Sequence, residues 1–287
     1  MNELDLYRHF QKICKFIFKF DVVSKYPEYF SESFEQFKTM YLCLRNKDGF
    51  DKLFHKIFSD RLDINIKDFI TEIVIAYTIT SKNNNVEITY EPDYQINGAN
   101  RPPDLRIHFE SYTFYIQIKR MSKSYSYQDN LKKFGDSDTM VIFDDIQQIV
   151  GALDKAARFT PKNANDIFLI IQLIPPEIPS SNIEISEVLY GREVACIDLK
   201  TGEFFLKRQK VNGENYKLNG GFFYSESGKR VDAYIKATEA NGLFFPYDYE
   251  MFINHTKAFD KKLIYNILDI CAEYNATTYF DNNAEAL

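Results

Sequence analysis

The sequence predicts an α/β protein in which helices flank a central sheet, with a helical layer before this core and an α+β extension after it. Three observations predict this class. Apolar residues recur at helical spacing in the first 60 positions, residues 104–121 alternate as strands do, and residues 166–174 form a continuous apolar run typical of a buried strand. We therefore expect three regions, a helical 1–65, a core of 66–175 and an α+β extension of 176–287.

The composition is that of a globular protein. The 287 residues include 35 basic and 41 acidic ones, for a formal net charge of −6, and 26 Phe and 20 Tyr but no Trp. This balance excludes a wholly disordered or collagen-like chain.

No stretch approaches the roughly 18 consecutive apolar residues that a membrane-spanning helix needs, so no membrane association is expected. Residues 1–20 mix charges into apolar positions, unlike a signal peptide, and we expect a cytoplasmic protein.

The first elements are predicted to be helices. Apolar spacing predicts a helix over 3–20, a second helix capped by Ser31 or Ser33 and ending before Gly49, and a short third helix over 51–58.

The next segment enters the predicted core. Asn65 is a candidate N-cap for a helix over 66–80, which is apolar nearly all round and should therefore be buried on most sides. A strand is predicted over 86–96, and Asn97-Gly98 is a turn signal.

The central part alternates between strands and helices. Strands are predicted over 104–109 and 113–121, close enough to form a hairpin, followed by a polar loop over 122–139. An amphipathic helix over 144–159 then precedes the apolar strand of 166–174.

The predicted extension starts after three prolines that follow this strand. A hairpin is predicted over 192–209, with its turn at Thr201-Gly202. Residues 231–240 and 255–274 are predicted to be helices.

Glu72 is unusual because it is the only carboxylate between Asp68 and Glu87 and lies within an apolar run. A carboxylate in such surroundings costs several kcal/mol unless it is paired, protonated or bound to a metal. The alternative is that Glu72 lies on the one solvated face of its helix.

A second group of polar residues lies on the predicted hairpin. Asp104 follows Pro102-Pro103, and Gln117 and Lys119 share one face of the strand, about 6–7 Å apart. If Asp104 lies on the neighbouring strand, all three side chains can converge. The alternative is an ordinary solvated sheet face.

Together these residues resemble the PD-(D/E)XK nuclease superfamily, whose pattern is a helix bearing Glu, a strand, a hairpin carrying Pro-Asp and (Glu/Asp/Gln)-x-Lys, a helix and a further strand. The matching segments, in order, are TEIVIAY, VEITYEP, NGANRPPD, YIQIKR, QQIVGALDKAARF and DIFLIIQL. The resemblance covers roughly residues 66–174, and its Gln-x-Lys-Arg form is similar to that of Mrr-type restriction endonucleases. It implies a restriction-endonuclease-like core, with a mixed central sheet flanked by helices.

The resemblance also implies roles for individual residues. Asp104 would bind Mg²⁺ (or Mn²⁺) directly, together with the amide oxygen of Gln117 and the main-chain carbonyl of Ile118. Glu72 would act through metal-bound water or orient Lys119. Lys119 would position and help to deprotonate the attacking water, or stabilise the charge of the phosphorane.

The expected partner is DNA, and a homodimer is compatible with double-strand cleavage. Residues 101–162 carry ten basic and eight acidic residues, so the acidity of the chain lies outside this segment. The candidate DNA-binding residues are Arg101, Arg106, Arg120, Lys123, Lys132 and Lys133.

The sequence therefore predicts a metal-dependent endonuclease that hydrolyses DNA phosphodiester bonds. Gln117 stands where the family usually has an acid, which removes one negative charge from the expected metal site. Two alternatives remain open: a catalytically inactive nucleic-acid-binding module of the same fold, and a protein-interaction domain whose Phe- and Tyr-rich flanks contact a partner.

Overall fold

The computed structural model describes most of the chain outside a central gap. The described ranges are 1–59, 65–92, 95–96, 99–100, 102–121, 149, 153, 166–176, 178, 181–197, 200–202, 204–209, 211–213, 216–218, 221–225, 228–258 and 260–274. The predicted loop over 122–139 lies outside these residues, as does most of the helix predicted over 144–159.

The N-terminal region is a layer of helices, as predicted. Its members are α1 (Glu3–Phe18), α2 (Val22–Lys25), α3 (Pro27–Leu44) and α4 (Phe50–Ile57), and they are followed by α5 (Ile66–Lys82). The predicted cap of the second helix is wrong, because α3 begins one turn earlier, with Pro27 in its first turn, and Ser31 and Ser33 lie inside the helix. Asn65 does occupy the N-cap position of α5, although its side chain makes no capping hydrogen bond.

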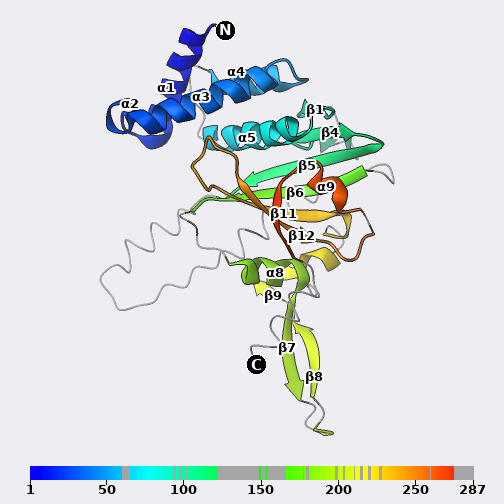
Figure 1. Ribbon diagram of the computed structural model, residues 1–287. Coiled ribbons are helices and arrows are strands. Elements are labelled where there is room, and N and C mark those ends of the chain that lie inside the picture. The colour runs from blue at the N-terminus through cyan, green and yellow to red at the C-terminus, as the bar shows by residue number, and fades with distance from the viewer. Residues whose placement is uncertain are drawn as a thin grey trace, which may run out of the picture.

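A seven-stranded mixed sheet forms the centre of the protein (Figure 1). In spatial order its strands are β1 (Glu87–Tyr90), β4 (Leu105–Phe109), β5 (Tyr112–Arg120), β6 (Asp166–Ile174), β11 (Ala233–Thr238), β12 (Asp248–Ile253) and β13 (Ile270–Tyr274). The β5–β6, β6–β11 and β12–β13 pairs are parallel and the other neighbours are antiparallel. The predicted β4–β5 hairpin and the buried strand β6 are confirmed, and so is the α/β class with helices flanking a mixed sheet.

The remaining elements lie around this sheet. They are α8 (Asn182–Tyr190), α9 (Lys262–Tyr265), the 3₁₀ turns η1 (Phe222–Tyr224) and η2 (Gly228–Arg230), and the strand pairs β2–β3 (Gln95–Ile96, Ala99–Asn100), β7–β8 (Arg192–Ile197, Phe204–Gln209) and β9–β10 (Val211–Gly213, Tyr216–Leu218). The hairpin predicted over 192–209 is confirmed as β7–β8, which projects away from the sheet in Figure 1. The strand predicted over 86–96 is not continuous. Among its described residues, those in strands are 87–90 (β1) and 95–96 (β2), and the two strands belong to different sheets.

Two predicted helices in the C-terminal region are wrong. Residues 231–240 contain β11, and residues 255–274 contain only the one-turn α9 followed by β13. The strand β11 lies between β6 and β12 and is buried along most of its length, so its ladder hydrogen bonds and packing outweigh the helix-favouring Ala and Lys of its sequence. Since β11, β12 and β13 join the sheet of β4–β6, the regions on either side of residue 175 share one sheet, and their division stays a prediction.

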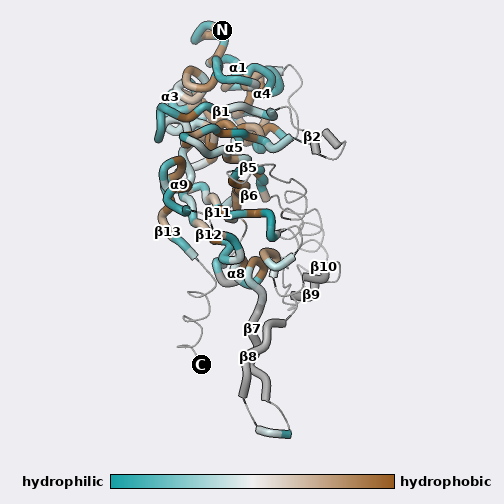
Figure 2. Tube along the Cα trace, turned by 90° about the vertical axis from the view of Figure 1, so that its right-hand side faces the viewer, coloured by the Kyte–Doolittle hydropathy of each residue, from teal (hydrophilic) through white to brown (hydrophobic). Residues whose placement is uncertain are grey.

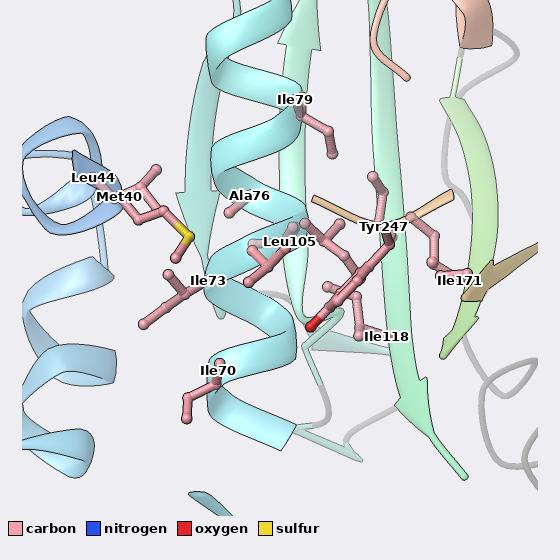
Figure 3. Packing of buried hydrophobic residues seen from close by; sticks show 14 of the residues in the cluster. Met40, Leu44, Ile70, Ile73, Ala76, Ile79, Leu105, Ile118, Ile171 and Tyr247 are labelled. Atoms are coloured by element: carbon pink, nitrogen blue, oxygen red, sulfur yellow. The ribbon is translucent and has the colours of Figure 1, made fainter. Parts of the chain in front are cut away.

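Both faces of the sheet are covered by apolar packing. On one face, α5 lies over the strands: in Figure 3 its Ile70 and Ile73 point toward the side of Met40 and Leu44, and Ile79 points toward the other side. On the opposite face, a second apolar cluster contains residues of α8 and η1, together with Val231, which follows η2. Figure 2 shows the hydrophobic segments gathered where α5 lies on the strands. Within the described part of the chain, no helix has the length and apolarity needed to cross a membrane.

Gly49 joins the helical layer to the edge of the sheet. It precedes α4 with a φ of 77°, and a Cβ added there would lie 2.2 Å from the carbonyl oxygen of Tyr90. The backbone N–H of Tyr90 donates to the carbonyl of Asp48 at 2.9 Å, so the two chain segments are in direct contact. Only a residue without a Cβ fits at this position.

Replacing this glycine should destabilise the protein. We expect Gly49→Ala to lower the free energy of unfolding by about 3 kcal/mol, because it adds both a strained positive φ and an overlap with backbone atoms. Gly202→Ala is the matched control: Gly202 has a φ of 73°, but a Cβ there would meet nothing within 4 Å. Urea unfolding of both variants measures the difference, and equal losses would contradict the close approach at Tyr90.

Candidate active site

The carboxylate of Asp104 lies at the entry to β4 and faces the end of β5. Its Oδ2 accepts hydrogen bonds from the side-chain Nε2 of Gln117 and, at 2.5 Å, from the backbone N–H of Ile118. Leu105 is opposite Ile116 in the antiparallel register, which brings Asp104 alongside Gln117. The expected convergence of Asp104 and Gln117 is therefore present.

Lys119 joins this group from the same strand. Its Nζ lies 3.8 Å from Oδ2 of Asp104, and its side chain is one-third exposed. The neighbouring positions Phe114, Ile116 and Ile118 belong to the core beneath α5, whereas Tyr115 packs in the opposite cluster. The alternation of β5 thus follows the period of two that the sequence predicts.

Glu72 reaches the site from α5. The residue is 9% exposed, so the alternative that it lies on a solvated helix face is wrong. Its Oε2 accepts a hydrogen bond of 2.8 Å from the phenol of Tyr90, the last residue of β1. Glu72, Asp104 and Lys119 are close enough for their charges to affect one another.

Burial dominates the electrostatics of the two acids. Desolvation, followed by the nearby charge of Asp104, raises the pKa of Glu72 from 4.5 to about 8. Desolvation also raises the pKa of Asp104, against the opposing effects of Lys119, the Ile118 N–H and Gln117. A buried and a partly buried carboxylate near a single lysine form a place where additional positive charge is favourable.

Two residues at the site carried no signal in the sequence analysis. Tyr90 holds the Glu72 carboxylate, and Glu91 follows it with a positive φ of 41°. The Glu91 backbone N–H donates to the Asp104 carbonyl at 2.9 Å, and its carboxylate pairs with Lys56 of α4 at 3.0 Å. Tyr90 was in principle recognisable, because a tyrosine on a buried strand face needs a partner for its hydroxyl.

The candidate DNA-binding residues fall into different surroundings. Arg120 forms an ion pair of 3.0 Å with Glu239, with both side chains at most 10% exposed, and this pairing takes its guanidinium away from solvent. Arg106 is half-buried and donates to the hydroxyl of Thr89 at 3.3 Å. Arg120 therefore does not present an open cation. The others, Arg101, Lys123, Lys132 and Lys133, lie outside the described residues.

The donor atoms suit a hard divalent cation. Asp104 and Glu72 supply carboxylate oxygens, and turning the Gln117 amide by 180° would present its oxygen to the same place. The N–H and C=O of a residue in an extended strand point to the same edge, so the Ile118 carbonyl lies on the edge of β5 that faces Asp104. Among the described residues, no three His, Cys, Asp or Glu side chains form a group that could hold a metal ion.

Comparison of the chain with protein-family models, curated proteins and solved structures found no match.

The burial of Glu72 predicts a pH-dependent effect of its removal. Between pH 4.5 and 8 the folded state keeps a proton that the unfolded state gives up, so the contribution of Glu72 to stability falls as pH rises. The Glu72→Gln variant has no such titration. Its free energy of unfolding should therefore rise relative to wild type by more than about 1.4 kcal/mol from pH 5 to pH 8, equivalent to one pKa unit.

Urea unfolding at both pH values, in the presence of EDTA, measures this change. Glu35→Gln, which alters an exposed carboxylate on α3, is the control and should differ from wild type by the same amount at both pH values. A Glu72→Gln difference that is independent of pH would show that the carboxylate ionises alike in both states.

Proposed function

We propose that the protein is a metal-dependent nuclease of the PD-(D/E)XK type, with a restriction-endonuclease-like core, that hydrolyses DNA phosphodiester bonds. The observation that carries the proposal is the meeting of Glu72, Asp104, Gln117 and Lys119 from α5, β4 and β5. They come from three segments that are separate in the sequence and occur in the order of the family motif. Purified protein should nick or linearise plasmid DNA with Mg²⁺ or Mn²⁺, and should lose this activity in EDTA.

Asp104 and Glu72 would hold the divalent cation in this proposal, with the oxygens of Gln117 and Ile118. When bound, such a cation supplies Lewis acidity at the scissile phosphate and lowers the pKa of a bound water. The two carboxylates would balance its charge, and the buried apolar residues of α5 around Glu72 would limit the access of bulk water.

Lys119 would act directly on the reacting atoms. Its ammonium group lies at the partly exposed edge of the site, held near Asp104, and can donate hydrogen bonds to the attacking water or to a non-bridging phosphate oxygen. In the second role it would stabilise the negative charge that develops on the pentavalent phosphorane. Asp104 thus has two functions, as a metal ligand and as the group that positions Lys119.

One observation favours a second candidate function. The Gln117 amide donates a hydrogen bond to Asp104, an arrangement that satisfies the carboxylate without a cation. A catalytically inactive DNA-binding module of the same fold would retain this contact. DNA binding that is sensitive to salt, with no cleavage in either Mg²⁺ or Mn²⁺, would select this function instead.

Lys119→Ala should reduce the rate of DNA cleavage by about 10²- to 10⁴-fold, the usual contribution of a positioned proton-transfer group. Asp104→Ala should abolish cleavage. Single-turnover cleavage of a labelled duplex at saturating Mg²⁺ measures both effects. Lys82→Ala is the control, because Lys82 has similar exposure but pairs with Asp269 on the surface. Undiminished cleavage by Lys119→Ala would eliminate this site.

Gln117→Glu should strengthen metal binding, because it adds a third anionic oxygen donor to the site. Without metal the same variant should be less stable than wild type, since a third carboxylate joins two that are already buried. Calorimetric titration with Mn²⁺ and thermal unfolding in EDTA measure the two effects. Gln36→Glu makes the same charge change on α3 and should alter neither property. Unchanged Mn²⁺ affinity in Gln117→Glu would remove this residue from the ligand set.

A further inference from the structure

The first two helices carry a local excess of positive charge in an acidic chain. Residues 8–25 contain five basic residues and one acidic residue, a formal charge of +4 with histidine neutral, whereas the whole chain carries −6. The basic residues are Arg8, Lys12, Lys15, Lys19 and Lys25. The candidate active site uses none of them.

Three of these cations lie along one face of α1, beside a hollow of about 380 Å³ that α1 forms with α2 and the start of α3. We call this the α1 hollow. Arg8, Lys12 and Lys15 line it at helical positions i, i+4 and i+7, and the buried side chains of Cys14 and Phe30 also line it. The cations follow one another along the helix instead of surrounding a single point.

The one acid at the hollow is already engaged. Asp21 caps α2, where its side chain accepts hydrogen bonds from the N–H of Val23 at 3.1 Å and from the hydroxyl of Ser24 at 2.7 Å. Arg8 lies 3.6 Å from Asp5, but both side chains are about half or more exposed, and such a pair is weak and screened by salt. The lining holds three cations and this one acid, so its formal charge is positive.

The spacing of the cations suits a linear polyanion. Arg8 and Lys15 are seven residues apart, which corresponds to about 10 Å along the helix axis. Phosphates of one DNA strand advance by about 3.4 Å along the duplex axis, so the row spans about three of them.

Contacts within the fold connect the α1 hollow with the candidate active site. The Lys12 ammonium donates to the Ser59 carbonyl at 3.3 Å, just before the segment that leads into α5. Tyr29, the neighbour of Phe30, packs against Phe245 with a ring-centroid separation of 6.2 Å.

The chain that precedes Phe245 leads back to the end of β5. A Cβ placed on Gly242 would lie 2.8 Å from the Tyr29 hydroxyl, and Glu239, three residues earlier, makes the buried ion pair with Arg120. Arg120 directly follows Lys119. The start of α3 at the hollow is thus in contact with the segment whose Glu239 pairs with the end of β5.

From this charge, spacing and position we propose that the basic face of α1 binds the sugar-phosphate backbone of the DNA that enters the candidate active site. The inference rests on the proposed nuclease function and extends it, because it assigns a backbone-binding surface outside residues 101–162. The contact is independent of base sequence and gives affinity through the neutralisation of phosphates.

The test measures DNA affinity without cleavage. Fluorescence anisotropy of a labelled 30-base-pair duplex, with Ca²⁺ in place of Mg²⁺, is recorded over a range of salt concentrations for wild type and Arg8→Ala/Lys15→Ala. Loss of two phosphate contacts should weaken binding at least about tenfold at low salt and reduce the slope of log K against log salt by about 1.8. Cleavage at saturating DNA in Mg²⁺ should stay within about twofold of wild type.

The control variant makes the same change of charge elsewhere. Lys229→Ala/Arg230→Ala removes one lysine and one arginine from exposed positions of η2, next to the apolar cluster on the opposite sheet face, and should leave the slope unchanged. If Arg8→Ala/Lys15→Ala does not fold, as judged by circular dichroism, Lys15→Gln alone should reduce the slope by about 0.9.

The outcomes separate this inference from the proposed function. Wild type that binds and cleaves DNA, with the same affinity and slope in Arg8→Ala/Lys15→Ala, would overturn the role of α1 alone. Wild type that neither binds nor cleaves DNA would overturn both proposals. A titration with pyrophosphate adds one more outcome. Binding of pyrophosphate to wild type but not to Arg8→Ala/Lys15→Ala, with DNA affinity unchanged in the variant, would make the hollow a small-anion site and would also overturn the inference.

Discussion

The packing of α5 against β4, β5 and β6 is the interaction on which the rest of the structure depends. This helix lies between the N-terminal helices and the sheet and buries nearly every side chain from Ile70 to Thr80 (Figure 3). Fully burying one large aliphatic side chain contributes about 1.5–3 kcal/mol, so this one element accounts for much of the core. The same packing holds the helix in one rotation, in which Glu72 is 9% exposed and accepts a hydrogen bond from Tyr90.

The surroundings of Glu72 show that packing in the hydrophobic core can set the pKa of a side chain at the candidate site. The acid is held by a single phenol and lies beside a second buried carboxylate. Its unusual proton affinity comes from the apolar residues that surround it, and the same residues keep it in place. A rigid surrounding of this kind positions functional groups more accurately than a surface loop does.

The sequence predicted those parts of the fold in which a periodic pattern and the tertiary environment agree. The strand β6 was predictable because every one of its nine residues is apolar or buried in the sheet, and β5 because its alternation matches its two different faces. The strands β11 and β13 were missed, because their neighbours in the sheet decide their conformation and those neighbours are distant in the sequence.

For the candidate site, the motif spacing identified Asp104, Gln117 and Lys119. Tyr90 and Lys56 come to the site through tertiary packing, and no local pattern marks Lys56.

The sheet order has a consequence for how the chain can be divided. β6 is hydrogen-bonded on one edge to β5 and on the other to β11, which comes from beyond residue 230. A fragment that ended at Pro175 would leave β6 as an open edge, with an unpaired row of N–H and C=O groups along a segment that is apolar on both faces. Such an edge is a template for pairing with another chain. The motif-bearing half of the protein therefore depends on the C-terminal half to cover this edge, and any fragment chosen by motif boundaries alone would be prone to aggregate.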